Sequence, residues 1–156
     1  MNTLKEIDDR IEPDEDSYET DPKLIERFEI QYNLDFMLDA AATEKNSKCV
    51  DWLDDALHEE WRKASQLDVW CNPPHSLNDE FIKRADAQHK KHNINICMIV
   101  PTRCQSMPTW HKLIESETEI ITENHPILKR PKFFKNGRPT KFPSKNAYRV
   151  IIWRKK

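Results

Sequence analysis

The sequence predicts a three-layer α/β domain with a mostly parallel sheet, and three observations lead to this expectation. Short apolar runs typical of strands alternate with amphipathic stretches typical of helices along most of the chain. Residues 94–100 are almost continuously apolar, which indicates a strand buried on both faces. The 156 residues are enough for one core but too few for two ordinary domains. We therefore expect helices on both faces of a single sheet.

Local signals place the elements of the first half of the chain. Asp21 can cap a helix that begins at Pro22, and Asp54 or Asp55 can cap a second helix. A loop of small residues at 40–43 separates the first two short apolar runs. The expected elements are a helix from Pro22 with Leu24, Ile25, Phe28 and Tyr32 on one face, strands at 34–39 and 47–52, a helix carrying Leu57 and Trp61, and a strand at 67–71.

The second half continues the alternation and ends in strands. Phe81, Ile82 and Ala85 mark the apolar face of a helix that precedes the buried strand at 94–100. The elements expected after this strand are a helix with Trp110, Leu113 and Ile114, strands at 119–122 and 147–153, and between them a hairpin within 131–142.

Composition narrows the class of protein. No segment approaches the apolar length of a membrane span, and the polar N-terminus is unlike a signal peptide. We therefore expect a soluble, cytoplasmic protein. The cysteines lack Cys-x-x-Cys spacing and favour buried free thiols over a zinc site; they are Cys49, Cys71, Cys97 and Cys104.

Charge is nearly balanced overall, at −2, but it is unevenly distributed. Acidic residues dominate 1–23, whereas residues 125–156 contain no Asp or Glu. Basic and aromatic side chains alternate in this C-terminal segment, which suits phosphates and stacked bases. Lysines that merely block a strand edge are the alternative. We expect residues 1–17 to be an acidic, flexible tail and residues 18–156 to be the single domain.

The motif Asn72-Pro73-Pro74-His75 directly follows the strand expected at 67–71. An amino nitrogen on a purine is a poor nucleophile, because its lone pair is delocalised into the ring. Acceptors on the Asn72 side chain and the Pro73 carbonyl, held by prolines of fixed φ, can bind the amino hydrogens and localise that pair. The motif resembles the Asn/Asp-Pro-Pro-aromatic loop of methyltransferases that act on exocyclic amino groups. The alternative is a turn that only starts a helix.

Asp39 ends the first expected strand, where α/β folds place their ligands, and can accept a hydrogen bond from a ligand amine or ribose. Ala40 begins a run of small residues that permits close approach of a ligand. Asp55 either binds the adenine of a cofactor or caps a helix. Arg103 follows the buried strand and either pairs with a phosphate or forms a structural salt bridge. Trp70 either packs in the core or stacks on a substrate, and Trp61 and Trp110 are most simply core or pocket-wall residues.

Taken in order, these motifs resemble the phage-type DNA N6-adenine methyltransferase (Dam) family, from about residue 18 to residue 153. The matching segments are Tyr18-Glu19-Thr20-Asp21-Pro22, Leu38-Asp39-Ala40-Ala41-Ala42 with Asn46 and Cys49, Asp54-Asp55-Ala56-Leu57 with Trp61, the Asn72 loop, Val100-Pro101-Thr102-Arg103 with Trp110, and residues 130–144. Two departures stand out. Asp21 separates Thr20 from Pro22, and His75 replaces the usual Tyr or Phe.

The resemblance implies a Rossmann-like, S-adenosylmethionine-dependent methyltransferase fold with a C-terminal antiparallel hairpin, and no metal. S-adenosylmethionine would be bound by Thr20, Asp39, Ala40 and Asp55. The catalytic loop would be Asn72, Pro73, Pro74 and His75, with His75 stacked on an adenine flipped out of double-stranded DNA. The DNA backbone would be bound by Arg103, Arg130, Lys132, Lys135, Arg138 and Lys141.

Two other functions fit the sequence. A degenerate methyltransferase fold could serve as a nucleic-acid-binding accessory module, which His75 and the scarcity of glycine favour. Alternatively, the same chemistry could act on RNA adenines or on glutamine amides, although the basic C-terminal segment argues against the amide.

Overall fold

The computed structural model describes residues 19–42, 46–62, 68–117, 119–125, 128, 131, 133–135, 137–139 and 147–156. The predicted acidic tail at 1–17 lies outside these residues, as do Arg130, Lys132 and Lys141. The elements are α1 (Pro22–Tyr32), β1 (Phe36–Asp39), β2 (Asp51–Trp52), β3 (Asp68–Cys71), the 3₁₀ turn η2 (His75–Leu77), α2 (Asn78–His92), β4 (Asn95–Pro101), the 3₁₀ segment η3 (Thr102–Ser106), the π-helical segment η4 (Trp110–Glu115), β5 (Ile121–Glu123), β6 (Phe134–Lys135), β7 (Arg138–Pro139) and β8 (Tyr148–Trp153).

The main sheet has six strands in the order β2-β1-β3-β4-β8-β5. The pairs β2–β1, β1–β3 and β3–β4 are parallel, whereas β8 runs antiparallel to both β4 and β5. The α/β class is therefore confirmed, but the sheet is mixed and only partly parallel, whereas a mostly parallel sheet was expected. The apolar run at 94–100 predicted burial of β4 on both faces; it carried no information on the direction of the strand that pairs with it.

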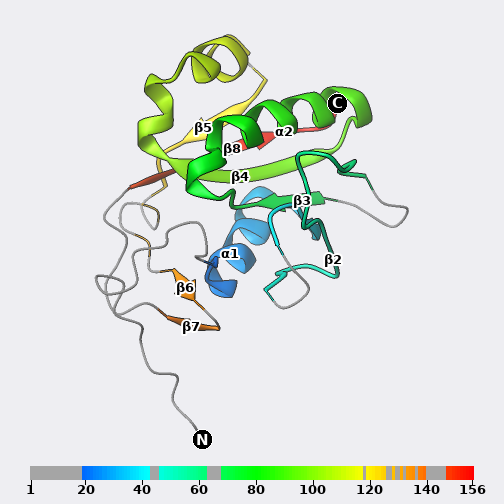
Figure 1. Cartoon of the computed structure of the whole chain (residues 1–156), viewed down its shortest axis with the longest axis vertical. Helices are drawn as coiled ribbons and strands as arrows, with labels where there is room; N and C mark the ends of the chain where they lie inside the picture. The colour runs from blue at the N-terminus through cyan, green and yellow to red at the C-terminus, as the bar shows by residue number, and fades with distance from the viewer. Residues whose placement is uncertain are drawn as a thin grey trace, which may run out of the picture.

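Two hydrophobic cores separate the sheet from its helices, as Figure 1 shows with α1 and α2 on opposite sides. Along β4, Met98 and Val100 pack into the core under α2, and Cys97 and Ile99 pack into the core under α1. All seven residues of β4 are buried. The three-layer arrangement follows from this alternation, because successive side chains of a strand point to opposite faces.

The helix α1 begins and ends as its sequence predicts. The Asp21 side chain accepts a hydrogen bond from the Lys23 amide at 3.0 Å, and Pro22 occupies the first helical position. The helix stops at Asn33, which adopts a left-handed conformation with φ of 54°. The predicted apolar face, Leu24, Ile25, Phe28 and Tyr32, is buried against the sheet.

Replacing Asp21 by alanine removes the side-chain acceptor at the start of α1. We expect the free energy of unfolding to fall by about 1 kcal/mol. Urea denaturation measures this, with Glu26→Ala on the exposed face of α1 as the control, for which we expect a change below about 0.5 kcal/mol. Equal losses in both variants would show that the cap contributes nothing.

The prediction of a helix around Leu57 and Trp61 is wrong. The chain makes one turn at Asp55, whose carbonyl accepts from the amides of residues 58 and 59, and then leaves helical geometry. Side chains of α2 bind the remaining backbone groups: Gln88 accepts from the Trp61 amide at 2.8 Å, and Arg84 donates to the carbonyls of Ala56 and Glu59. Tertiary hydrogen bonds therefore replace the helical ones.

The strand expected at 47–52 shrinks to β2, Asp51–Trp52. The Ser47 hydroxyl bonds both the amide and the carbonyl of Cys49, which creates a local turn in place of sheet pairing. Val50 is 72% exposed, although its branched side chain favours a strand. The strands predicted at 34–39, 67–71, 94–100, 119–122 and 147–153 are confirmed as β1, β3, β4, β5 and β8, with ends shifted by at most two residues.

The hairpin predicted within 131–142 is confirmed in its described part as β6 and β7, which pair antiparallel apart from the main sheet. Gly137 supplies the positive φ of 74° at the turn. Glu19 bridges this hairpin to the start of α1, because its backbone exchanges hydrogen bonds of 2.7 and 2.8 Å with Phe134. The hairpin is thereby held close to the segment that precedes α1 (Figure 1).

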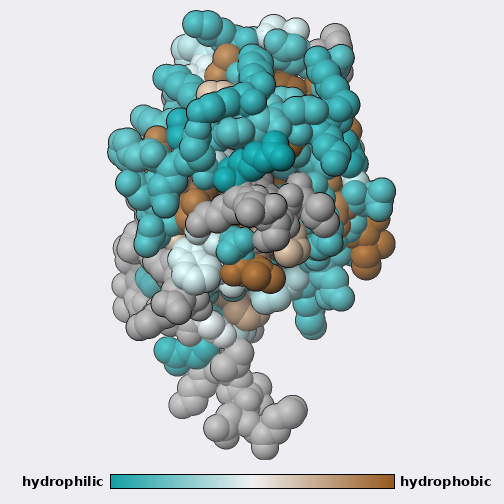
Figure 2. All heavy atoms as spheres, turned by 90° about the vertical axis from the view of Figure 1, so that its right-hand side faces the viewer, coloured by the Kyte–Doolittle hydropathy of each residue, from teal (hydrophilic) through white to brown (hydrophobic). Residues whose placement is uncertain are grey.

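Among the described residues, no helix combines the length and the apolar character needed to cross a membrane. Figure 2 shows a face dominated by hydrophilic side chains, with apolar groups in small patches. Few large apolar side chains are exposed in the described part of the chain; they are Ile30, Val50, Met107 and Ile121.

Candidate active site

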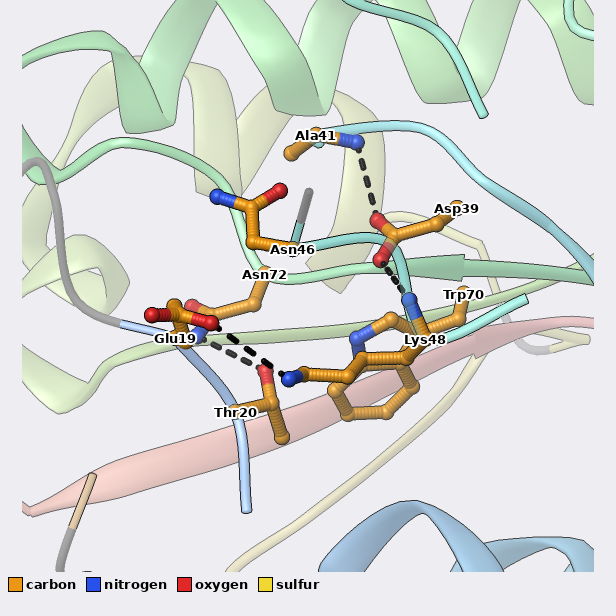
Figure 3. A pocket seen from close by; sticks show the side chains of 8 residues that line it. All are labelled: Glu19, Thr20, Asp39, Ala41, Asn46, Lys48, Trp70 and Asn72. Carbon is orange, nitrogen blue, oxygen red and sulfur yellow. Dashed lines mark hydrogen bonds and ion pairs between the residues drawn. The ribbon is translucent and has the colours of Figure 1, made fainter. Parts of the chain in front are cut away.

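The candidate site lies at the carboxyl ends of β1 and β3. From these neighbouring strands the chain continues in opposite directions, to β2 on one side and to β4 on the other, which is where open α/β sheets bind ligands. A pocket of about 250 Å³, its open mouth included, occupies this position (Figure 3). It is lined by Glu19, Thr20, Asp39, Ala41, Asn46, Lys48, Trp70 and Asn72.

Asn72 is the first residue after β3 and projects into the pocket beside Thr20 (Figure 3). Its amide nitrogen donates a hydrogen bond of 3.0 Å to the Thr20 hydroxyl, 52 residues earlier in the chain. This bond fixes the plane of the Asn72 side-chain amide, with its nitrogen directed at Thr20. The side-chain oxygen of Asn72 therefore has a fixed orientation as an acceptor. The sequence predicted both residues for this site, and the structure brings them together.

The two prolines connect β3 to the helical layer. Pro73 is buried, and Pro74, with φ of −55°, precedes η2 and accepts a hydrogen bond from the Leu77 amide at 2.9 Å. The motif therefore does start a helix, as the alternative interpretation expected. It also holds Asn72 at the pocket, so both functions are served by the same rigid segment.

His75 is half-buried and is bound by a residue that the sequence did not indicate. Its Nε2 lies 2.6 Å from the hydroxyl of Tyr148 on β8, and the two rings are 5.5 Å apart. Tyr148 is itself buried and packs edge-on against Phe133 at 5.0 Å. The orientation of the imidazole is therefore set by Tyr148 on β8. This strand pairs with β4 on the side away from β3, the strand that His75 follows.

Asp39 is 4% exposed and has intramolecular partners for both carboxylate oxygens. They accept from the amides of Ala41 at 3.2 Å and Lys48 at 3.0 Å, so Asp39 closes the loop after β1 (Figure 3). Burial raises the pKa of Asp39 to about 6, and the two amides oppose that rise. Ala40 is fully buried and donates to the Trp70 carbonyl, so Ala41 lines the pocket in its place.

Asp39 should make folding stability depend on pH. Because its folded pKa of about 6 exceeds the ordinary 3.8, its contribution is complete below the lower value and is lost as the pH rises through the higher one. We expect the stability of the wild type relative to Asp39→Asn to fall by up to about 3 kcal/mol over this range. The amide variant loses one acceptor, but that cost does not vary with pH. Urea titrations across the range measure the difference, and a constant difference would contradict this origin.

Glu19 and Lys48 face each other across the pocket (Figure 3). The Lys48 ammonium lies 3.6 Å from the Glu19 carboxylate, and their side chains are only 16% and 9% exposed. The second carboxylate oxygen of Glu19 accepts from the Gly137 amide at 3.1 Å. The pocket lining thus contains one cation, Lys48, and two acidic side chains, Glu19 and Asp39, next to the Asn72–Thr20 pair.

Residues 9–155 match the family described as DNA N-6-adenine-methyltransferase (Dam). The chain belongs to this family. A protein of Escherichia phage T1 named DNA N-6-adenine-methyltransferase is 36% identical over 89 residues, which are 55% of this chain. The chain covers 36% of the length of that phage protein.

Other residues predicted for this Dam-family site lie away from the pocket. Asp55 is absent from its lining; its side chain is 62% exposed and bonds to His58. Arg103 is exposed in η3, after the carboxyl end of β4, and none of the ion pairs between described residues includes it. Lys135 and Arg138 flank the hairpin turn, half-buried and exposed respectively.

The core interpretations of the aromatic and sulfur residues are confirmed. Trp61, Trp70 and Trp110 are buried, and Trp70 also forms part of the pocket wall. All four cysteines are free, three of them buried and Cys49 half-buried. Burial raises the pKa of the Cys71 thiol well above its usual value, which makes it a poor nucleophile.

Glu19, Lys48 and Tyr148 are the site residues that sequence reasoning missed. Glu19 stands within the matching segment that contains Thr20, and Lys48 stands next to Cys49, but neither was assigned a role and no spacing in the sequence relates Glu19 to Lys48. Tyr148 was visible only as one aromatic residue in the basic segment. Each acts through a contact distant in sequence, which a local pattern does not reveal.

Proposed function

We propose that this chain transfers the methyl group of S-adenosylmethionine to the N6 amino group of adenine in DNA. Membership of the Dam family supports this reaction. The observation that carries the proposal is the position of Asn72, held by Thr20 at the pocket between β1 and β3. The strand order β2-β1-β3-β4 further supports a Rossmann-like methyltransferase fold, with its ligand at this point of the sheet.

The pocket residues fit such a methyl donor in chemical type. When bound, S-adenosylmethionine supplies an electrophilic methyl group on a positively charged sulfur. Thr20 offers a hydroxyl, Asp39 a carboxylate, and Trp70 an apolar wall, while Asn46 adds an amide. We assign these residues to donor binding, and the Ala40–Ala41 backbone to close approach at the end of β1.

Asn72 and Pro73 would activate the acceptor amino group. The Asn72 carbonyl oxygen and the Pro73 backbone carbonyl accept the two amino hydrogens, which draws the nitrogen lone pair out of the ring and directs it away from the base. Charge that develops on this nitrogen during transfer is stabilised by the same oxygens. Both acceptors are fixed before the substrate arrives, because Thr20 and the prolines hold them. The surplus proton leaves only after the new bond has formed, so a strong base is unnecessary.

The DNA side of the proposal uses exposed cations and His75. Arg103 and Arg138 are exposed and suit phosphate oxygens, and the same role is proposed for Lys135, Arg130, Lys132 and Lys141. A target adenine rotated out of the duplex would stack on the imidazole of His75. Its ring can serve as a platform because Tyr148 fixes its orientation.

The test is methyl transfer with labelled S-adenosylmethionine to duplex DNA and, separately, to RNA of the same sequence. Digestion to nucleosides followed by mass spectrometry should give N6-methyladenine from the DNA. Product from RNA alone would move the activity to the RNA alternative. No product from either, with no calorimetric binding of S-adenosylhomocysteine, would favour an accessory module that binds nucleic acid.

A further inference from the structure

We propose that Glu19 and Lys48 form a charge clamp for the amino-acid end of the cofactor. Lys48 binds its carboxylate, and Glu19 binds its ammonium. This inference rests on the proposed function and assigns the part of the ligand that these two side chains recognise. It uses residues that neither the motif nor the resemblance assigned to binding.

The geometry of the pair is the first argument. The Lys48 ammonium and the Glu19 carboxylate are 3.6 Å apart, which satisfies an ion pair but exceeds the length of a good hydrogen bond. Both side chains are largely withdrawn from water, at 16% and 9% exposure. Charges so placed are stabilised only when short hydrogen bonds compensate for lost hydration. Among the contacts between described residues, the pair therefore has only part of this compensation, and a ligand can supply more.

The anchoring of the two residues is the second argument. The Lys48 amide donates to Asp39 at 3.0 Å, and one oxygen of Glu19 accepts from Gly137 at 3.1 Å. Lys48 is thus held by its backbone, and Glu19 by its backbone bonds to Phe134 and by one carboxylate oxygen, while the charged groups of both line the pocket (Figure 3). Such a site is organised before the ligand arrives, which reduces the entropy lost on binding.

The identity of the ligand group follows from the charges. A free α-amino acid moiety carries one carboxylate and one ammonium, and so complements the facing cation and anion of Lys48 and Glu19. A phosphate would meet the carboxylates of Glu19 and Asp39 together with the single cation of Lys48. When the zwitterion binds, Lys48 exchanges the Glu19 carboxylate for the carboxylate of the ligand. Glu19 likewise exchanges the Lys48 ammonium for the ammonium of the ligand. The Glu19–Lys48 pair and the bound zwitterion together carry no net charge, and they gain charge-assisted hydrogen bonds.

Calorimetry with the full chain tests the clamp, using a series of ligands that differ in the charged groups they carry. The ligands are S-adenosylhomocysteine, its analogue without the carboxylate, its analogue without the amine, and 5′-methylthioadenosine, which lacks both groups. The wild type should bind S-adenosylhomocysteine about 10- to 100-fold more tightly than either single-charge analogue, as expected for one charge-assisted bond. Equal affinities across the series would overturn the inference without any variant.

Two variants assign the individual charges. Lys48→Met should weaken S-adenosylhomocysteine about 10- to 100-fold and leave the carboxylate-free analogue within about 2-fold of wild type. Glu19→Gln keeps an acceptor for Gly137. It should weaken the binding of S-adenosylhomocysteine, and it should leave the binding of the analogue without the amine unchanged. Lys83→Met is the matched control, because Lys83 pairs with Asp79 at 3.5 Å outside the pocket, and it should bind like wild type.

The outcomes separate this inference from the proposed function. Binding of S-adenosylhomocysteine by the wild type, with Lys48→Met weakening every ligand equally, would make the pair structural and overturn the clamp alone. Absence of S-adenosylhomocysteine binding by the wild type would remove the proposed function and the clamp with it. A circular dichroism melt of each variant shows whether an affinity loss reflects unfolding.

Discussion

Replacing Asn72 by alanine is expected to reduce methyl transfer to DNA by about 100- to 1,000-fold, the range found when one preorganised group is removed from a reacting centre. The variant loses the side-chain oxygen that binds the amino group, and the loss is felt most as charge develops on nitrogen. Binding of S-adenosylhomocysteine should change by only a few-fold, because Asn72 is one of eight residues that line the pocket. Single-turnover transfer and calorimetry measure the two effects separately.

Asn72→Asp and Thr20→Val are the informative companions of this variant. Aspartate keeps the side-chain oxygen that accepts from the amino group, and its second oxygen, in place of the Asn72 nitrogen, can accept from the Thr20 hydroxyl, so much of the activity should remain. Thr20→Val removes the partner that holds the amide plane and should lower the rate by less than Asn72→Ala. Transfer at the wild-type rate by Asn72→Ala would exclude the loop from the chemistry.

The elements that the sequence predicted well are those specified by nearby residues. The α1 boundaries follow from Asp21, Pro22 and the spacing of the apolar face, all within one segment. β4 is recognisable because both of its faces need apolar side chains. The failure around Trp61 has the opposite cause, since Gln88 is 27 residues away and binds its amide. Local helix signals cannot register such a competitor.

The residues of the candidate site also fall into two groups, those recognisable from the local sequence and those brought in by distant contacts. The Asn72 loop was found because its chemistry is written in consecutive residues, and Asp39 because it ends a strand. The partners of these groups come from elsewhere: Thr20 lies 52 residues before Asn72, and Tyr148 lies 73 residues after His75. Which residues meet at a sheet edge depends on strand order, including the antiparallel β8 that the apolar pattern did not predict.

His75→Ala is expected to weaken productive DNA binding by about 5- to 150-fold, because stacking on one aromatic side chain contributes about 1–3 kcal/mol per base. The change should be confined to steps that involve DNA, so S-adenosylhomocysteine affinity should match the wild type. A 2-aminopurine placed at the target position reports the extruded base by its fluorescence. We expect the emission increase to be smaller with His75→Ala than with the wild type.

Tyr148→Phe distinguishes the ring of His75 from its orientation. The variant keeps the buried ring that packs against Phe133 and removes only the hydroxyl bound to His75 Nε2. If the orientation of the ring matters, Tyr148→Phe should transfer methyl groups more slowly than the wild type but faster than His75→Ala. His75→Phe combined with Tyr148→Phe restores an apolar platform with no unpaired hydroxyl, and should recover most of the stacking. Wild-type fluorescence from His75→Ala would show that the base is received elsewhere, and the ring would then serve only to join the loop to β8.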